Sequence, residues 1–213
     1  MTWFLDNLSY IRGLAWRHLW LSVLPVALGF VIAVPIGWYA ARSRRIGGAL
    51  LTIGSLVYTI PSLPLLVIIP GLLGTSFLDP TNVVLVLTIY AVAVMLRSAA
   101  DGFASVPRAV VDAARASGYA RWQQVLLVEL PLAGPVLLAG VRVVSVSTVS
   151  LVTIAPLIGV ANLGSLFTDG FQRYFTTEII IGVLCVVVLA LVLDLLWVLI
   201  GRLAMPWLRV STR

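Results

Sequence analysis

The chain has 213 residues, of which 61% are hydrophobic and only 10% are charged. Because a soluble domain carries about 25% charged residues, this composition excludes an ordinary water-soluble fold and indicates one all-α polytopic membrane domain over residues 1–213. The fourteen cations are all arginines and give a net charge of +6; they are spread over short segments between apolar runs, which indicates orientation signals and argues against a nucleic-acid-binding patch.

The first half of the chain contains two long uncharged runs. Leu19–Ala41 is long enough to be the first transmembrane helix, since a span needs about 20 mostly apolar residues. Residues 46–78 are too long for one helix, and prolines divide them. We expect a second span over Gly47–Ile60, a break over 60–64, and a short helix to Leu73. A broken backbone at membrane depth should face protein or a water-filled path.

Three further spans follow a turn at Asp79-Pro80. The third span is predicted from Thr81 to Leu96, where Arg97 ends the apolar run. After a polar segment, the fourth span begins near Pro131 and continues to about Ile158. Residues 159–177 are expected to form a loop or a partial re-entry, and the last span covers Glu178–Leu203. The chain therefore has about five spans.

The arginine distribution predicts the orientation. Five spans place the termini on opposite sides of the membrane, with three arginines on one side, ten on the other and Arg142 within a span. Since the arginine-rich side is cytoplasmic, we expect the N-terminus outside and the C-terminus inside. The ten cytoplasmic arginines are Arg42, Arg44, Arg45, Arg97, Arg108, Arg115, Arg121, Arg202, Arg209 and Arg213.

The polar segment between spans three and four is predicted to contain two short helices. Pro107 is suited to be the first helical residue, with Ser105 or Val106 as the cap. Gly118 is suited to end the helix in the left-handed conformation, and a second helix starts near Ala120 and runs into the fourth span. One face of the first helix carries Val110, Ala113, Ala114 and Ser117, whereas Arg108, Asp112 and Arg115 lie on the other face and can form two local ion pairs.

Two interpretations of this first helix follow from its residues. The small side chains of Ala113 and Ala114 allow a partner surface to approach closely, which suits a helix inserted into a cleft of a cytoplasmic protein. The alternative is a helix packed on lipid headgroups with its arginines reaching the interface. Physical reasoning alone leaves both open.

The spacing of this segment resembles a known motif. The order is an acidic residue followed by Ala-Ala, three residues, Gly, nine residues, an aliphatic residue, one residue, and Leu-Pro. It is similar to the EAA loop of bacterial ABC-importer permeases, with aspartate in place of the usual glutamate. The resemblance implies a cytoplasmic EAA segment over residues 104–131 that docks on an ATPase, with coupling residues Asp112, Ala113, Ala114, Gly118, Leu130 and Pro131.

A wider resemblance covers residues 15–205. The stretches 60–63, 128–142 and 158–164 are similar to permeases of the osmoprotectant (glycine betaine, carnitine, choline, proline) uptake family. This implies the type I importer permease fold, a multi-pass protein of the bacterial plasma membrane, and no catalysis or cofactor in this chain. ATP-Mg would bind to separate ATPase subunits. A separate extracytoplasmic protein would deliver the solute, and a second permease copy or paralogue would complete the path.

Five residues are candidates for lining that path. Tyr58 and Pro61 lie at the predicted break and Tyr90 lies in the third span, although both tyrosines could simply be packing residues, and no aromatic cage is expected in the spans. Arg142 is an ionisable residue within a span, which makes it a candidate functional residue, and Asp194 is its expected partner. The alternative for Arg142 is a position at the inner vestibule.

Other classes of protein remain as alternatives. An intramembrane enzyme lacks the GxSxG and HExxH motifs, His18 is the only histidine, and Cys185 is the only cysteine. An ion-coupled secondary transporter is favoured only by Asp194 and the proline break. A permease of the same superfamily for another small solute, such as an amino acid, is the closest competitor.

Overall fold

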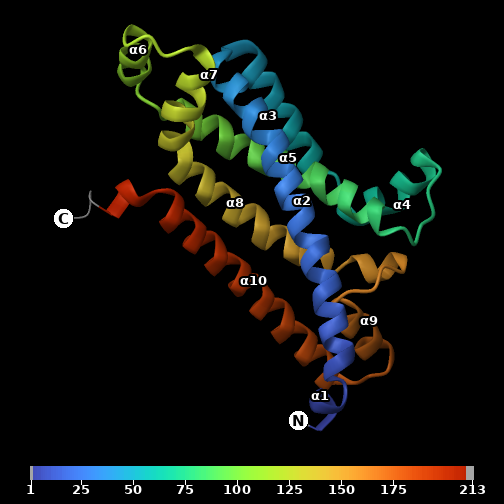
Figure 1. The fold of residues 1–213 in the computed structure, drawn as a ribbon. Helices are drawn as coiled ribbons and strands as arrows, with labels where there is room; N and C mark the ends of the chain where they lie inside the picture. The colour runs from blue at the N-terminus through green and yellow to red at the C-terminus, as the bar shows by residue number, and fades with distance from the viewer. Residues whose placement is uncertain (1, 210–213) are drawn as a thin grey trace.

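The computed structural model describes residues 2–209, and Arg213 of the predicted cytoplasmic set lies outside this range. The described residues form helices and turns and no strand. Figure 1 shows the helices in chain order. They are α1 (Thr2–Asp6), α2 (Leu8–Arg42), α3 (Arg44–Thr59), α4 (Ser62–Leu73), α5 (Pro80–Ala104), α6 (Arg108–Ala116), α7 (Arg121–Gln123), the π-helix η1 (Gln124–Glu129), α8 (Leu130–Val152), the 3₁₀ turn η2 (Ala155–Ile158), α9 (Ser165–Gln172), α10 (Thr176–Ala204) and the 3₁₀ turn η3 (Pro206–Arg209).

Four continuous helical stretches of the described chain are long and apolar enough to cross a membrane: α2, α5, the stretch Arg121–Val152, and α10. The pair α3 and α4 qualifies as a broken span, with a bend of 98° between its halves. The predicted all-α fold is therefore confirmed, including the break after Ile60, and the predicted number of five spans is reached if α3 and α4 count as one broken span. The first and last described helices end on opposite sides of the bundle, as an odd number of spans requires (Figure 1).

The boundaries of the first and third spans differ from the predictions. Helix α2 begins at Leu8, before the predicted Leu19, because Arg12 and Arg17 interrupt the apolar run without interrupting the helix. Its 35 residues span about 52 Å at 1.5 Å per residue, which exceeds the bilayer core of about 30 Å. Helix α5 continues past Arg97 to Ala104, where the Arg97–Asp101 pair at 3.1 Å supports the additional turn.

The fourth span ends earlier than predicted, at Val152, where the predicted end was Ile158. The Asn162 side-chain amide donates to the carbonyls of Val152 and Val160, at 3.0 and 3.1 Å, and so holds the chain in a turn. The Asn162 amide oxygen lies 3.2 Å from the His18 ring, which is fully buried on α2. Residues 159–175 then form helix α9 and its flanking turns, and α10 begins at Thr176, two residues before the predicted Glu178.

Helix α5 is the centre of the bundle, with α2, α3 and α8 packed against it. Small residues allow the backbones to approach: a Cβ added at Gly37 on α2 would lie 2.9 Å from the Ala100 nitrogen and 3.0 Å from the Ala99 carbonyl carbon. Gly29, about two turns before Gly37 on α2, faces Ala91 on α5 in the same way. Small residues at such positions are what membrane helix interfaces require, because lipid provides no hydrophobic drive for association.

Replacing Gly37 by leucine is expected to separate α2 from α5 and destabilise the fold by about 1–3 kcal/mol, the usual cost of overpacking. The measurement is the thermal unfolding midpoint of the purified protein in detergent. Gly48→Leu is the matched control, because no atom lies within 4 Å of an added Cβ at Gly48. Equal midpoints for the two variants would contradict the close contact.

Candidate functional site

Helix α6 of the EAA segment lies at the rim of the bundle, where it packs against η1 and Val111 contacts the core, and none of its residues is buried. Figure 1 shows it at the end of the molecule opposite α1 and α9. Ala113 is exposed and Ala114 is half-buried. Of the two predicted local ion pairs, the structure forms Asp112–Arg115, with 3.8 Å between the charged atoms and both side chains largely exposed.

The start of α6 differs from the prediction by one residue. Pro107 is the extended cap residue, with φ −63° and ψ 127°, and its carbonyl accepts from Val110 N–H. Neither of the two predicted cap residues caps α6. The Ser105 hydroxyl donates to the Gly102 carbonyl at 2.8 Å, and Val106 is buried in the core. The chain therefore leaves the bundle at Val106 and starts α6 immediately afterwards.

Gly118 ends α6 as predicted. Its φ of +84° lies in the left-handed region, and the Tyr119 N–H donates to the Ala114 carbonyl at 3.1 Å. No atom lies within 4 Å of an added Cβ, so the backbone conformation is the only constraint on this position. A glycine meets that constraint without strain.

The second half of the EAA segment is continuous with a membrane helix. The second helix starts near Ala120, as predicted: Ala120 is the cap of α7, and its N–H donates to the Gln123 side chain at 2.8 Å. The helix then widens into η1 and passes into α8 at Leu130, with Pro131 in the first turn. Pro131 has no N–H to donate to the preceding turn, which favours the wider π geometry. π-Helical turns are frequent at functional sites.

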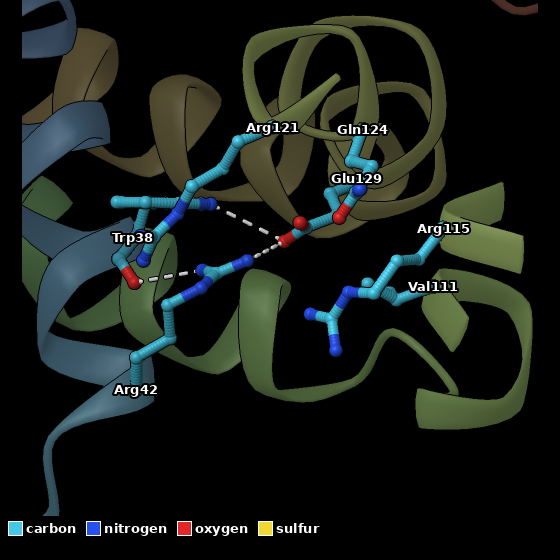
Figure 2. A pocket seen from close by; sticks show the side chains of 7 residues that line it. All are labelled: Trp38, Arg42, Val111, Arg115, Arg121, Gln124 and Glu129. Carbon is cyan, nitrogen blue, oxygen red and sulfur yellow. Dashed lines mark hydrogen bonds and ion pairs between the residues drawn. The ribbon is translucent and has the colours of Figure 1, made fainter. Parts of the chain in front are cut away.

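Glu129, at the end of η1, connects the EAA segment to the end of α2. Its side chain is 4% exposed and accepts hydrogen bonds from Trp38 Nε1 at 3.2 Å and from the Arg42 guanidinium, with which it forms an ion pair. Figure 2 shows these groups around a cavity of about 410 Å³. Its described lining residues are Trp38, Arg42, Val111, Arg115, Arg121, Gln124 and Glu129. Sequence reasoning missed Trp38 and Arg42, because they lie some 90 positions from Glu129.

Arg142 and Asp194 form the expected pair across α8 and α10. The Arg142 Nε and Nη2 atoms donate to the two carboxylate oxygens of Asp194 at 2.7 and 2.8 Å. The side chains are 41% and 29% exposed, so the pair lies at the edge of the α8–α10 contact. It joins α10, which is otherwise largely exposed, to the bundle.

Tyr58 and Tyr90 meet at the break between α3 and α4. Their rings pack edge to face, with centroids 5.9 Å apart and planes at 78°. The Tyr90 hydroxyl donates to the Ile60 carbonyl, directly before the extended Pro61. The sequence predicted no aromatic cluster in the spans, and this pair is a partial departure from that prediction. Tyr58 keeps 48% of its surface exposed, whereas Tyr90 is buried.

These features define a multi-pass membrane domain with a broken span and an exposed helical segment. The family described as "Binding-protein-dependent transport system inner membrane component" matches residues 33–210. The chain belongs to this family. It is therefore a multi-pass protein of the plasma membrane, in a family whose members work with ATPase and solute-binding partners.

Three similar proteins each match nearly the whole chain. The osmoprotectant import permease protein OsmW of Salmonella typhimurium is 33% identical, over 92% of this chain and 91% of its own length. The carnitine transport permease protein OpuCD of Listeria monocytogenes is 32% identical over 90% and 86%. The glycine betaine/carnitine/choline permease protein OpuCB of Bacillus subtilis is 31% identical over 89% and 86%.

A solved structure confirms the fold class. The inward-facing MetNI methionine ABC transporter contains a chain that superimposes with a TM-score of 0.82, covering 93% of this chain and 98% of that chain. The sequence identity is 22%. At this identity the likeness establishes the importer permease fold and nothing about the solute.

Replacing Arg142 by leucine is expected to lower the thermal unfolding midpoint in detergent by several degrees, since it leaves the Asp194 carboxylate without its partner. The double variant Arg142→Leu with Asp194→Leu should recover most of the loss, because no unpaired charge remains. A double variant as unstable as Arg142→Leu would contradict the pairing account. Normal solute uptake by the double variant would remove both residues from the translocation path.

Proposed function

We propose that the chain is the permease subunit of an ATP-driven importer for compatible solutes of the glycine betaine, carnitine, choline or proline type. The observation that carries this proposal is the EAA segment: an exposed helix, a left-handed glycine and a helix continuous with α8, in a chain of this family. The names of three relatives that cover most of the chain support the solute class.

In this proposal the chain performs no chemistry. Asp112, Ala113, Ala114 and Gly118 dock on a separate ATPase, which binds ATP-Mg, while Leu130 and Pro131 join the docked segment to α8. A second permease copy or paralogue completes the path, and an extracytoplasmic protein delivers the solute. Closure of the ATPase pair moves α6, and the continuous stretch Arg121–Val152 carries that movement into the membrane.

The orientation follows from the same proposal. The EAA segment must lie in the cytoplasm to reach an ATPase, which places the N-terminus outside and the C-terminus inside. The arginine distribution favours this arrangement independently. The end of the molecule that carries α1 and α9 would then face the solute-binding protein (Figure 1).

We place the path beside the break at Pro61. Tyr58 offers an exposed ring there, and aromatic faces attract quaternary ammonium groups. The Tyr90 hydroxyl holds the carbonyl of Ile60 and so fixes the position of the break. Arg142 and Asp194 neutralise each other at the α8–α10 contact, which favours a structural role for this pair.

Ala113→Glu is expected to reduce co-purification of the ATPase on the order of tenfold, because it places a longer charged side chain on a docking face of small residues. Ala104→Glu is the matched control: Ala104 is also exposed but is the last residue of α5, outside α6. The measurement is the ratio of ATPase to permease after affinity purification from membranes. An equal ratio for both variants would show that the docking face is assigned wrongly.

Gly118→Val is expected to leave the protein inserted but to uncouple ATP hydrolysis from uptake. A β-branched residue at φ +84° is strained by about 1–2 kcal/mol or more, so the angle between α6 and α7 must change. Uptake and ATP hydrolysis are measured together in proteoliposomes that contain the complete transporter. Gly48→Val, in an open position with no neighbour within 4 Å, should behave as wild type, and normal uptake by Gly118→Val would refute the hinge role.

A further inference from the structure

Glu129 is buried at the junction between the EAA segment and the membrane helices, and a closed set of contacts surrounds its carboxylate. Arg42 donates to it while also donating to the Trp38 carbonyl at 3.1 Å. The Arg42 guanidinium lies over the Trp38 ring, 3.8 Å from its centroid. Trp38 Nε1 completes the set by donating to Glu129 at 3.2 Å. The three side chains therefore hold one another in a fixed arrangement.

The contacts among Glu129, Arg42 and Trp38 connect the EAA segment to the end of α2. Glu129 is the last residue of η1, directly before Leu130-Pro131, and α6 packs against η1. Arg42 is the last residue of α2, and Ser43 caps α3 by accepting from Ile46 N–H. A shift of η1 would therefore act on the end of α2 and on the start of the broken span, in addition to its direct path through α8.

The Glu129 carboxylate offsets the positive charge of the arginines around the cavity. Arg42, Arg115 and Arg121 all line it, and Glu129 is the one acidic residue among its described lining residues. Figure 2 shows the Arg115 side chain extending from α6 toward the Arg42–Glu129 pair. Without the Glu129 carboxylate, three guanidinium groups would face a common space with like charge, which opposes close packing of α6, α7 and α2.

We propose that Glu129, Arg42 and Trp38 form a joint that carries the movement of the ATPase-docked EAA segment to α2 and thence to the broken span. This inference rests on the function proposed above. Glu129 is a positioning residue, since it acts through α2 and touches no solute. An apolar contact at this place could slide, whereas a buried charge pair with a tryptophan N–H is directional and costly to separate.

The test is a double-mutant cycle in the complete transporter, reconstituted in proteoliposomes with its ATPase and solute-binding subunits. The permease variants are Glu129→Gln, Arg42→Gln and the combination of both. ATP hydrolysis and uptake of radiolabelled glycine betaine, carnitine and choline are measured in the same preparation. The exposed pair Arg97–Asp101 on α5 supplies the matched controls Arg97→Gln and Asp101→Asn.

Each single variant is expected to lower the uptake per ATP hydrolysed roughly tenfold, within the usual range of coupling between sites, while the ATPase co-purifies as with wild type. The combination should be no worse than the more impaired single variant, because both remove the same interaction. Uptake per ATP that stays at the wild-type value in Glu129→Gln would overturn the proposal. Single effects that multiply in the combination would overturn it equally.

A readout that does not depend on the solute separates this proposal from the proposed function. Trp16 on α2 is 68% exposed, and a Trp16→Cys variant in a Cys185→Ser background reports the position of α2 through its rate of thiol labelling. We expect ATP to change that rate, and Glu129→Gln to abolish the change. If both results are obtained while none of the three solutes is taken up, the proposed joint is supported and the proposed solute class is wrong. An ATP-dependent change in labelling that persists in Glu129→Gln would contradict the proposed joint.

Discussion

The absence of water in the bilayer is the constraint on which the whole structure depends. A polar group in a membrane span must find its partner within the protein, and the described residues contain no buried side-chain nitrogen or oxygen without one. The Tyr90 hydroxyl satisfies the carbonyl exposed by the Pro61 break, Asn162 satisfies the Val152 carbonyl at the end of α8, and Arg142 pairs with Asp194. These three departures from a regular apolar helix are therefore stabilised by specific side-chain contacts.

The same constraint explains why the EAA segment has its form. The segment between α5 and α8 is polar, and α6 buries none of its residues, so it lies outside the apolar core of the bilayer. Its second half has no flexible connection to the membrane: α7, η1 and α8 form one helical stretch from Arg121 to Val152. A force applied at α6 can therefore reach the bundle through a stiff element. The Glu129–Arg42 contact adds a second, lateral connection to α2.

The sequence predicts what depends on local pattern, and misses what depends on distant contacts. The five spans, the break at Pro61 and the left-handed Gly118 follow from apolar runs, proline chemistry and glycine chemistry. The length of α2 does not, because Arg12 and Arg17 resemble the end of a span although the helix extends beyond them to Leu8. The pairing of Glu129 with Trp38 and Arg42, and of Tyr58 with Tyr90, cannot be predicted from spacing, since it depends on how helices far apart in sequence pack.

The central claim is that α6 meets an ATPase on its Ala113 face. Site-specific photo-crosslinking tests it most directly, with a photoreactive amino acid in place of Ala113 in one variant and of Tyr174 in another. Tyr174 is 94% exposed between α9 and α10, and Figure 1 shows α9 at the opposite end of the molecule from α6. After irradiation of intact membrane vesicles that contain the whole transporter, we predict a covalent product with the ATPase from position 113 and none from position 174. A crosslink to the ATPase from position 174, or no crosslink from position 113, would contradict the account.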